Sequence, residues 1–390
     1  MKLKKLSVVI VFILAIGLLY CVNKRFAQDH GRRIDIGAEL IKLAKKDNLG
    51  EIKIMLSHHP DSVESCLKRI GCKLLQEASM AGSLKTVKYL VTEKKLDINC
   101  NEGSALFYAS SMGRAEMVQY LLQHEAKILP NGYSRENPLH VAANTNPDLW
   151  VEREEKDFSK INVFSVAKIL VEHGIDVNTL DRNHETPLHK AAFTKNYLIA
   201  EYLIEQKAEV NCQDKYGNTP LHKACFTNKD NSICALLLNH GANPSVKNKD
   251  GKTPILWGYG SVDTSTIDLF ANYGYDPVHD SDNEGYMLLH LALKNGQFAT
   301  IDYLLDHKVN INAVTKKGIT PFHIAVKLRG TNGLSVIKKL MNGGANINAL
   351  DASGHTPLFY ISKIIESDHG TYFPDTLIVN FLRENGALSL

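Results

Sequence analysis

A tetrapeptide that returns at a nearly constant spacing constrains this sequence more than any other feature. It reads Thr-Pro-Leu-His at residues 186–189 and again at residues 219–222. Looser versions begin at Asn137, Thr253, Met287, Thr320 and Thr356. From residue 186 onward, successive copies begin 33, 34, 34, 33 and 36 residues apart. A nearly fixed period of this size predicts a fold of stacked repeats, because each repeat needs its neighbours to bury its apolar face.

The residues of one repeat predict two short helices joined by turns. The Thr186 hydroxyl can accept a hydrogen bond from an amide of the first turn, and Pro187 suits the first helical position. In sister repeats a glycine such as Gly296 is expected to end the first helix. Residues 197–206 predict the second helix, since their apolar residues recur at helical spacing. A polar turn such as residues 214–217 then leads to the next repeat.

This repeat closely resembles the ankyrin repeat. The residues that carry the resemblance in one copy are Asp214, Gly217, Thr219, Pro220, Leu221, His222, Ala224, Leu236, Leu237, Gly241, Ala242 and Asn243. The resemblance implies an all-α fold, an ankyrin-repeat α-solenoid of stacked helix-turn-helix units with short β-turn fingers. It also implies that the chain is a protein-interaction module whose partners contact the finger tips and the exposed side of the first helix.

The sequence predicts three regions of different character. We expect a membrane-targeting segment at 1–25, a polar linker at 26–36 and about ten repeats over 37–390. Repeats one and two lack Thr-Pro, as expected for a capping end of a solenoid. The fourth repeat, which begins at Asn137, carries an insertion at 144–162 that includes Trp150. This insertion is either a solvated loop or an arm that contacts a partner.

An uncharged apolar run at residues 6–22 lies between lysine and arginine residues on both sides. At about 1.5 Å per residue the run spans about 25 Å, the short end of the range for a membrane helix. No small-x-small cleavage site follows it. We therefore expect an uncleaved signal-anchor and a single-pass membrane protein. The alternative is a secreted ankyrin effector whose signal peptide is removed. The orientation stays open, because basic residues flank both ends.

Charge and motifs argue against several other classes of function. The net charge is only +3, and no domain is strongly basic, so nucleic acid binding is not indicated. The stretch Gly251-Lys252-Thr253 lacks the first glycine of a phosphate-binding loop. No HExxH or Gly-x-Ser-x-Gly motif is present. We expect no catalytic residues, no cofactor and a monomeric chain, and an enzyme or toxin is the disfavoured alternative.

Histidines and cysteines are expected to serve the fold. Five of the sixteen histidines occupy the fourth place of the tetrapeptide, where the family's ring ties the turn to the helix. No metal site is therefore predicted. The seven cysteines are scattered, odd in number and without a CxxC, which argues against a disulfide framework or a zinc finger. We expect them to be buried as small hydrophobic residues.

The candidate partner-binding residues lie at the finger tips and on the first helices of repeats five to seven. They are Arg182, Phe193, Lys215, Tyr216, Phe226, Lys249 and Lys252, with Trp150 in the insertion as a further candidate. Aromatic and arginine side chains are favoured at the centres of interfaces. This combination predicts an acidic or extended segment of a protein partner. The alternative is that Phe193 and Phe226 pack between repeats and the lysines are only solvated.

Overall fold

The computed structural model describes residues 36–58, 60–145, 162–226, 231–258, 260, 262–361 and 376–389. The predicted anchor at 6–22, all of the predicted linker except Ile36, and Trp150 lie outside the described residues. Within the described part of the chain, no helix has both the length and the apolar character needed to cross a membrane. The described residues form two compact bodies, the first within residues 1–78 and 83–96 and the second within 79–82 and 97–390.

The first body contains α2 (Ile36–Lys45), α3 (Leu49–His58), most of α4 (Pro60–Ala81) and α5 (Leu84–Thr92). Asp47, in the turn after α2, accepts hydrogen bonds from the backbone amide and the hydroxyl of Thr86 at 2.9 and 2.8 Å. This carboxylate therefore holds the α2–α3 turn against the start of α5. The 22-residue α4 is longer than any helix that the repeat pattern predicts.

The second body consists of helix pairs, each corresponding to one sequence repeat. The pairs are α6 (Cys100–Ser111) with α7 (Ala115–Gln123), α8 (Pro138–Ala143) with α9 (Val163–Glu172), α10 (Pro187–Thr194) with α11 (Tyr197–Glu205), α12 (Pro220–Phe226) with α13 (Ser232–Asn239), α14 (Pro254–Trp257) with α15 (Thr264–Asn272), α16 (Leu288–Asn295) with α17 (Phe298–Asp306), and α18 (Pro321–Ala325) with α19 (Gly330–Asn342). A short helix η3 (Pro277–His279) follows α15, and α21 (Thr376–Glu384) is the last helix. The described residues contain no strand, only isolated bridges at Asn131–Glu136 and Ser281–Met287.

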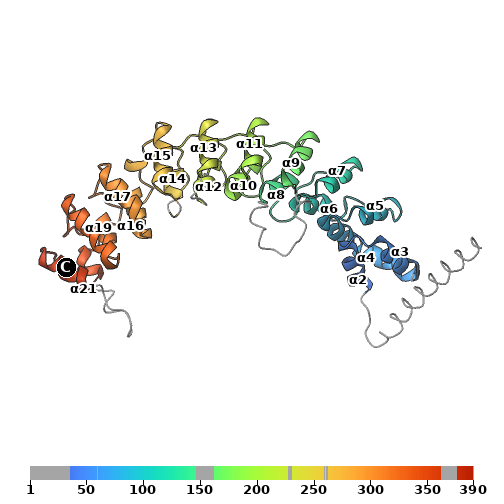
Figure 1. Cartoon of the computed structure of the whole chain (residues 1–390), viewed down its shortest axis with the longest axis horizontal. Helices are drawn as coiled ribbons and strands as arrows, with labels where there is room; N and C mark the ends of the chain where they lie inside the picture. The colour runs from blue at the N-terminus through green and yellow to red at the C-terminus, as the bar shows by residue number, and fades with distance from the viewer. Residues whose placement is uncertain are drawn as a thin grey trace, which may run out of the picture. The chain divides into compact units, whose positions relative to one another are not determined.

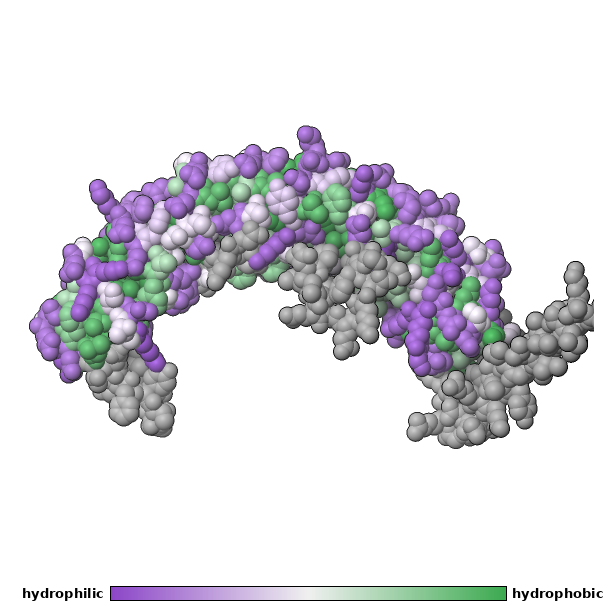
Figure 2. All heavy atoms as spheres, viewed as in Figure 1, coloured by the Kyte–Doolittle hydropathy of each residue, from purple (hydrophilic) through white to green (hydrophobic). Residues whose placement is uncertain are grey.

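The first helices of neighbouring repeats pack directly on one another, α8 on α10, α10 on α12 and α12 on α14. In Figure 1 they lie along one edge of the second body, and the second helices lie along the opposite edge. Leu139, Leu188 and Leu221 recur at the same repeat position and are completely buried between these helices. In Figure 2 hydrophilic residues cover much of the visible surface of this body, and hydrophobic residues show between them. The core is thus continuous from repeat to repeat.

Each tetrapeptide histidine does more than the predicted local tie. The Nδ1 atom of His189 accepts from the backbone amide of Thr186 at 3.1 Å, and its Nε2 lies 3.1 Å from the carbonyl of Asn218 in the next finger. His222 repeats the pattern with Thr219 at 3.1 Å and Lys252 at 3.0 Å. An accepting Nδ1 and a donating Nε2 describe a neutral ring. Accordingly, burial lowers the pKa of His189 and of His222 to about 4.

The fingers are joined by one backbone hydrogen bond from each tip to the previous tip. The Arg182 amide donates to Ser134, the Lys215 amide to Asn183 and the Lys249 amide to Tyr216, at 2.8, 2.8 and 2.9 Å. This close approach explains the tip glycine Gly251, which has φ +74°. A Cβ atom at Gly251 would lie 2.7 Å from the backbone nitrogen of Asn283 in the next finger. The predicted helix end at Gly296 is confirmed, since this residue caps α16 with φ +64°.

The cysteines depart in part from the sequence expectation. Cys72 in α4 and Cys100 at the start of α6 are each disulfide-bonded, which departs from the expectation that the cysteines are buried as small hydrophobic residues. Sequence spacing could not reveal it, because pairing depends on which cysteines meet in the fold. Cys225 and Cys234 are free and buried, as expected of small hydrophobic residues.

Candidate functional site

Three aromatic rings form a ladder along the first helices of repeats five to seven. Phe193 of α10 stacks on Phe226 of α12 with ring centroids 6.4 Å apart and planes inclined by 18°. Phe226 contacts Trp257 of α14 at 4.6 Å and 37°. Phe193 remains 42% exposed and Phe226 47% exposed. The ring ladder therefore packs between repeats, and it also presents apolar surface to solvent. The packing interpretation and the surface interpretation of Phe193 and Phe226 each describe part of their environment.

Helical geometry places two lysines beside the ladder. Lys190 precedes Phe193 by three residues in α10, and Lys223 precedes Phe226 by three in α12. Residues three apart on a helix share a face. Trp257 directly follows the tetrapeptide of repeat seven, as Lys190 and Lys223 follow those of repeats five and six. The Lys223 Nζ atom lies 5.5 Å from the Trp257 ring centroid, so the ladder and the lysines form one continuous surface.

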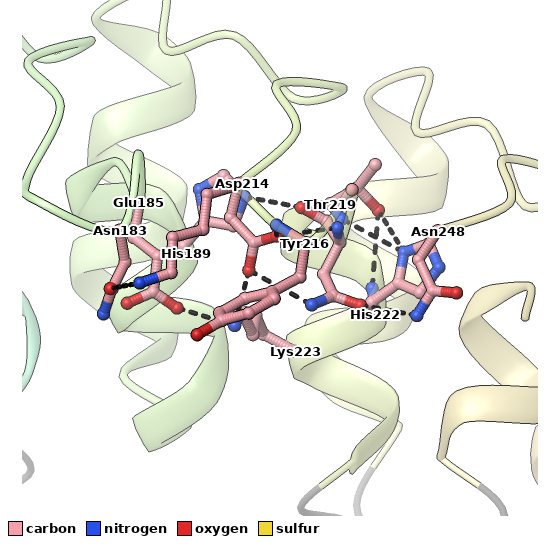
Figure 3. A network of polar contacts seen from close by, with 12 residues as sticks. Asn183, Glu185, His189, Asp214, Tyr216, Thr219, His222, Lys223 and Asn248 are labelled. Carbon is pink, nitrogen blue, oxygen red and sulfur yellow. Dashed lines mark hydrogen bonds and ion pairs between the residues drawn. The ribbon is translucent and has the colours of Figure 1, made fainter. Parts of the chain in front are cut away.

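These two lysines belong to a charged network that spans three repeats. The Lys190 Nζ atom lies 3.0 Å from Glu136, 2.9 Å from Asp181 and 2.7 Å from Glu185. Lys223 continues the chain of ion pairs, with Glu185 at 2.6 Å and Asp214 at 2.9 Å. In Figure 3 the side chains of Glu185, Asp214 and Lys223 point toward one another beneath the fingers. We call these six residues the lysine network.

The lysine network is largely buried and anionic. The side chains of Asp214 and Asp181 are 0% and 2% exposed, and those of Lys223 and Lys190 are 11% and 12% exposed. Burial alone would raise the pKa of Asp214, but hydrogen bonds from Lys223 and Asn218 outweigh it and hold that pKa below its ordinary value. Four carboxylates face two ammonium groups, so the network carries a formal charge of −2.

The finger tips present the predicted basic residues on the surface. The Arg182 guanidinium carbon lies 3.3 Å from the centroid of the Tyr133 ring, and the Lys215 Nζ atom lies 4.9 Å from the centroid of Tyr216. Lys215 also donates to the side chain of Asn183. Lys249 is exposed, and Tyr216 is 55% exposed. Within the described residues, none of Arg182, Lys215 and Lys249 takes part in an ion pair.

Two shallow hollows lie among these fingers. The first, of about 400 Å³, is lined by His184, Gln213, Asp214, Lys215, Gly217, Lys247, Asn248 and Lys249. The second, of about 360 Å³, is lined by Lys249, Asp250, Lys252, Asp282, Asn283, Glu284, Tyr286, Leu291 and Lys294. Both linings are dominated by polar and charged side chains, unlike the apolar linings typical of small-molecule sites. In the described part of the chain no cluster of three or more His, Cys, Asp or Glu residues could hold a metal ion.

The structure brings most of the sequence candidates into one region. Phe193 and Phe226 lie in the ladder, and Arg182, Lys215, Tyr216, Lys249 and Lys252 lie on the fingers beside it. Trp257 and the lysine network are not among the residues predicted from the sequence. Aligning the residue that follows each tetrapeptide would have shown Lys190, Lys223 and Trp257 in one register. Glu136 pairs with Lys190 and Glu185 pairs with Lys223 across more than 30 residues of sequence, so no local pattern reveals these two ion pairs.

Comparison with known families agrees with this architecture. A family model described as "Ankyrin repeats (3 copies)" matches residues 40–131, 75–152, 157–214 and 259–351. A second, described as "Ankyrin repeats (many copies)", matches residues 203–255. Stacked helix pairs joined by β-turn fingers define a helical repeat protein of the solenoid class. Because the matches cover most of its length, the chain belongs to the ankyrin repeat family.

Curated relatives come from viruses and animals. The ankyrin repeat protein FPV115 of fowlpox virus is 28% identical over 290 residues, covering 71% of this chain and 52% of that protein. Human "Transient receptor potential cation channel subfamily A member 1" is 26% identical over 381 residues, 92% of this chain and 32% of its own length. Mouse Rabankyrin-5 is 28% identical over 218 residues, 55% of this chain and 14% of its own. The chain thus spans about half or less of the length of these relatives.

Proposed function

We propose that this chain is a non-enzymatic protein-interaction module that holds a partner polypeptide against repeats five to seven. The observation that carries the proposal is the ring ladder, whose phenylalanines stay more than two fifths exposed although they contact each other. Exposed aromatic side chains in a row are typical of the centre of a protein interface. The row of finger-tip cations beside the ladder, Arg182, Lys215 and Lys249, supports a partner segment with acidic groups.

The test is capture of interacting proteins by the full chain in parallel with matched variants. We expect Tyr216→Ala with Phe226→Ala to lose proteins that the unmodified chain captures, because both side chains are exposed and central to the surface. Leu198→Ala is the control, since Leu198 is 58% exposed on the second helix of repeat five, away from the ladder. Equal capture by both variants and the unmodified chain would place the interface elsewhere on the solenoid, with the insertion around Trp150 as the next candidate.

We further propose that residues 6–22 tether the module to a membrane as a single-pass anchor. The uncharged run between basic residues supports this proposal. The disulfide bonding of Cys72 and Cys100 suits a repeat domain on the oxidising side of a membrane. An anchored chain should stay in the membrane pellet after a carbonate wash. A soluble product that starts beyond residue 22 would instead identify a secreted protein with a cleaved signal peptide.

A further inference from the structure

The candidate surface is divided into three zones across its width. The outer zone is the finger row, which we define as Arg182, Lys215 and Lys249 at the tips. The middle zone is the lysine network at the base of the fingers, where Asp214 directly precedes Lys215 in the chain. The inner zone is the ring ladder, which Lys223 joins to the network through its contact with Trp257. The surface therefore changes from cationic to anionic to aromatic over a short distance.

The middle zone limits where a partner can place its charges. Its formal charge of −2 sits on side chains that are at most 18% exposed, so water screens it poorly. Lys190 and Lys223 look basic in the sequence, but their own carboxylates already neutralise them. Acidic groups of a partner are thus attracted to the finger row and repelled from the network. Of the cations in these two zones, those of the finger row are the ones without a carboxylate partner among the described residues.

An extended polypeptide that runs along the repeats meets this pattern with alternating side chains. Successive residues of an extended chain point to opposite sides, so one set faces the fingers and the other faces the ladder. Side chains on the same side are about 6.6 Å apart. The ring centroids are 6.4 Å apart between Phe193 and Phe226 and 4.6 Å apart between Phe226 and Trp257. An apolar residue at every second position can therefore follow the ladder.

We infer that the partner binds through an extended segment in which acidic and apolar residues alternate, with the acids toward the finger row and the apolar residues on the ring ladder. This inference rests on the proposed function and narrows it from acidic or extended segments in general to one pattern. Three repeats at about 10 Å spacing span about 20 Å, which about six extended residues cover. The recognised segment is therefore short.

The inference is tested with labelled synthetic peptides and the purified full chain, by fluorescence anisotropy. One peptide alternates Glu and Leu, a second has the same composition with Glu and Leu in separate blocks, and a third alternates Lys and Leu. We expect the alternating Glu peptide to bind at least about tenfold more tightly than the other two. Equal binding of the block peptide would overturn the inference, because charge and hydrophobicity alone would then explain recognition.

Variants test the contributions of the ring ladder and of the finger row to peptide binding separately. Phe226→Ala should weaken binding of the alternating Glu peptide about tenfold, and Lys215→Ser with Lys249→Ser should weaken it and flatten its salt dependence. If the alanine variant unfolds, Phe226→Leu takes its place, because leucine keeps an apolar side chain in the stack. Lys168→Ser, on the exposed face of α9, is the charge control. Loss of binding from the lysine change alone would contradict a role for the ladder.

Two further outcomes would also overturn the inference. Tighter binding of a single-stranded oligonucleotide than of any peptide would mean that the ladder stacks bases. Tighter peptide binding after deletion of residues 146–161 would mean that this acidic insertion, and not a partner, occupies the surface. The result is separable from the proposed function: captured proteins that lack the alternating segment refute only the inference, whereas no ladder-dependent capture refutes the function itself.

Discussion

Replacement of Lys223 by methionine tests the energetic role of the lysine network. Methionine keeps much of the length of the side chain and removes its charge, so the change isolates the ion pairs. Glu185 keeps Lys190 at 2.7 Å after the substitution. Asp214 keeps hydrogen bonds from the amides of Tyr216 and Asn218 at 2.8 Å but loses its ammonium partner. One fully buried carboxylate is thus left without a counter-charge.

The expected loss of stability follows from the partners that Asp214 keeps and the one that it loses. Removing one member of a buried ion pair costs about 3–5 kcal/mol. The hydrogen bonds that remain on Asp214 place the expected value near the lower end, about 3 kcal/mol. A change of about 3 kcal/mol in the free energy of local opening is about a 150-fold change in the opening equilibrium. Hydrogen exchange in α10, α12 and α14 should accelerate by about this factor, because contacts in a solenoid are between neighbours.

The pH dependence gives an independent check on the cause. The pKa of Asp214 is lowered in the folded chain, so the pair's contribution is present above the ordinary carboxyl pKa of about 4. It is lost as the pH falls through the lowered value. The difference in unfolding free energy between Lys223→Met and the unmodified chain should therefore be full at neutral pH and shrink in acid. Adding Asp214→Asn should recover part of the loss at neutral pH.

Two results would refute this reasoning. Exchange that accelerates equally in α17 and α19 would show that the network acts on the whole stack and not on its neighbours. A Lys223→Met chain as stable as the unmodified one at neutral pH would show that desolvation already cancels the ion pairs in the folded state. Lys168→Met on α9, whose side chain is 57% exposed, is the matched control and should change exchange little.

Two substitutions and one titration test the packing, the histidines and the fingers. Leu221→Asp should cost several kcal/mol, because it places an unpaired charge at a completely buried position; hydrogen exchange should be fastest in repeat six and its neighbours. His222 should stay neutral until about pH 4, so its contribution to stability should decline as the pH falls from about 6.5 toward 4, and an NMR titration of the ring that shows charging near pH 6.5 would contradict this. Gly251→Ala should lower the melting temperature more than Gly241→Ala, since both residues have positive φ but only Gly251 abuts Asn283 of the next finger.

The sequence alone was enough to predict the repeat fold, because the signals that define it are local. Thr186 and Pro187 begin α10, and the periodic leucines bury one face of each helix. A glycine with positive φ ends α16 at Gly296. Each of these effects operates within a few residues and recurs at every period, so each copy reinforces the same prediction. The exposed aromatic and basic residues of the candidate surface followed from their places in the repeat.

Only the tertiary structure decided how those residues are charged, paired and arranged. Lys190 and Lys223 are basic residues in the sequence, yet carboxylates of their own and of neighbouring repeats surround them and make the middle of the surface anionic. Trp257 joins the ladder only because α12 and α14 pack side by side. The ring contacts of the ladder and the ion pairs Glu136–Lys190 and Glu185–Lys223 join residues about 30 or more positions apart. Their energies depend on distance and burial in space, which a one-dimensional pattern does not contain.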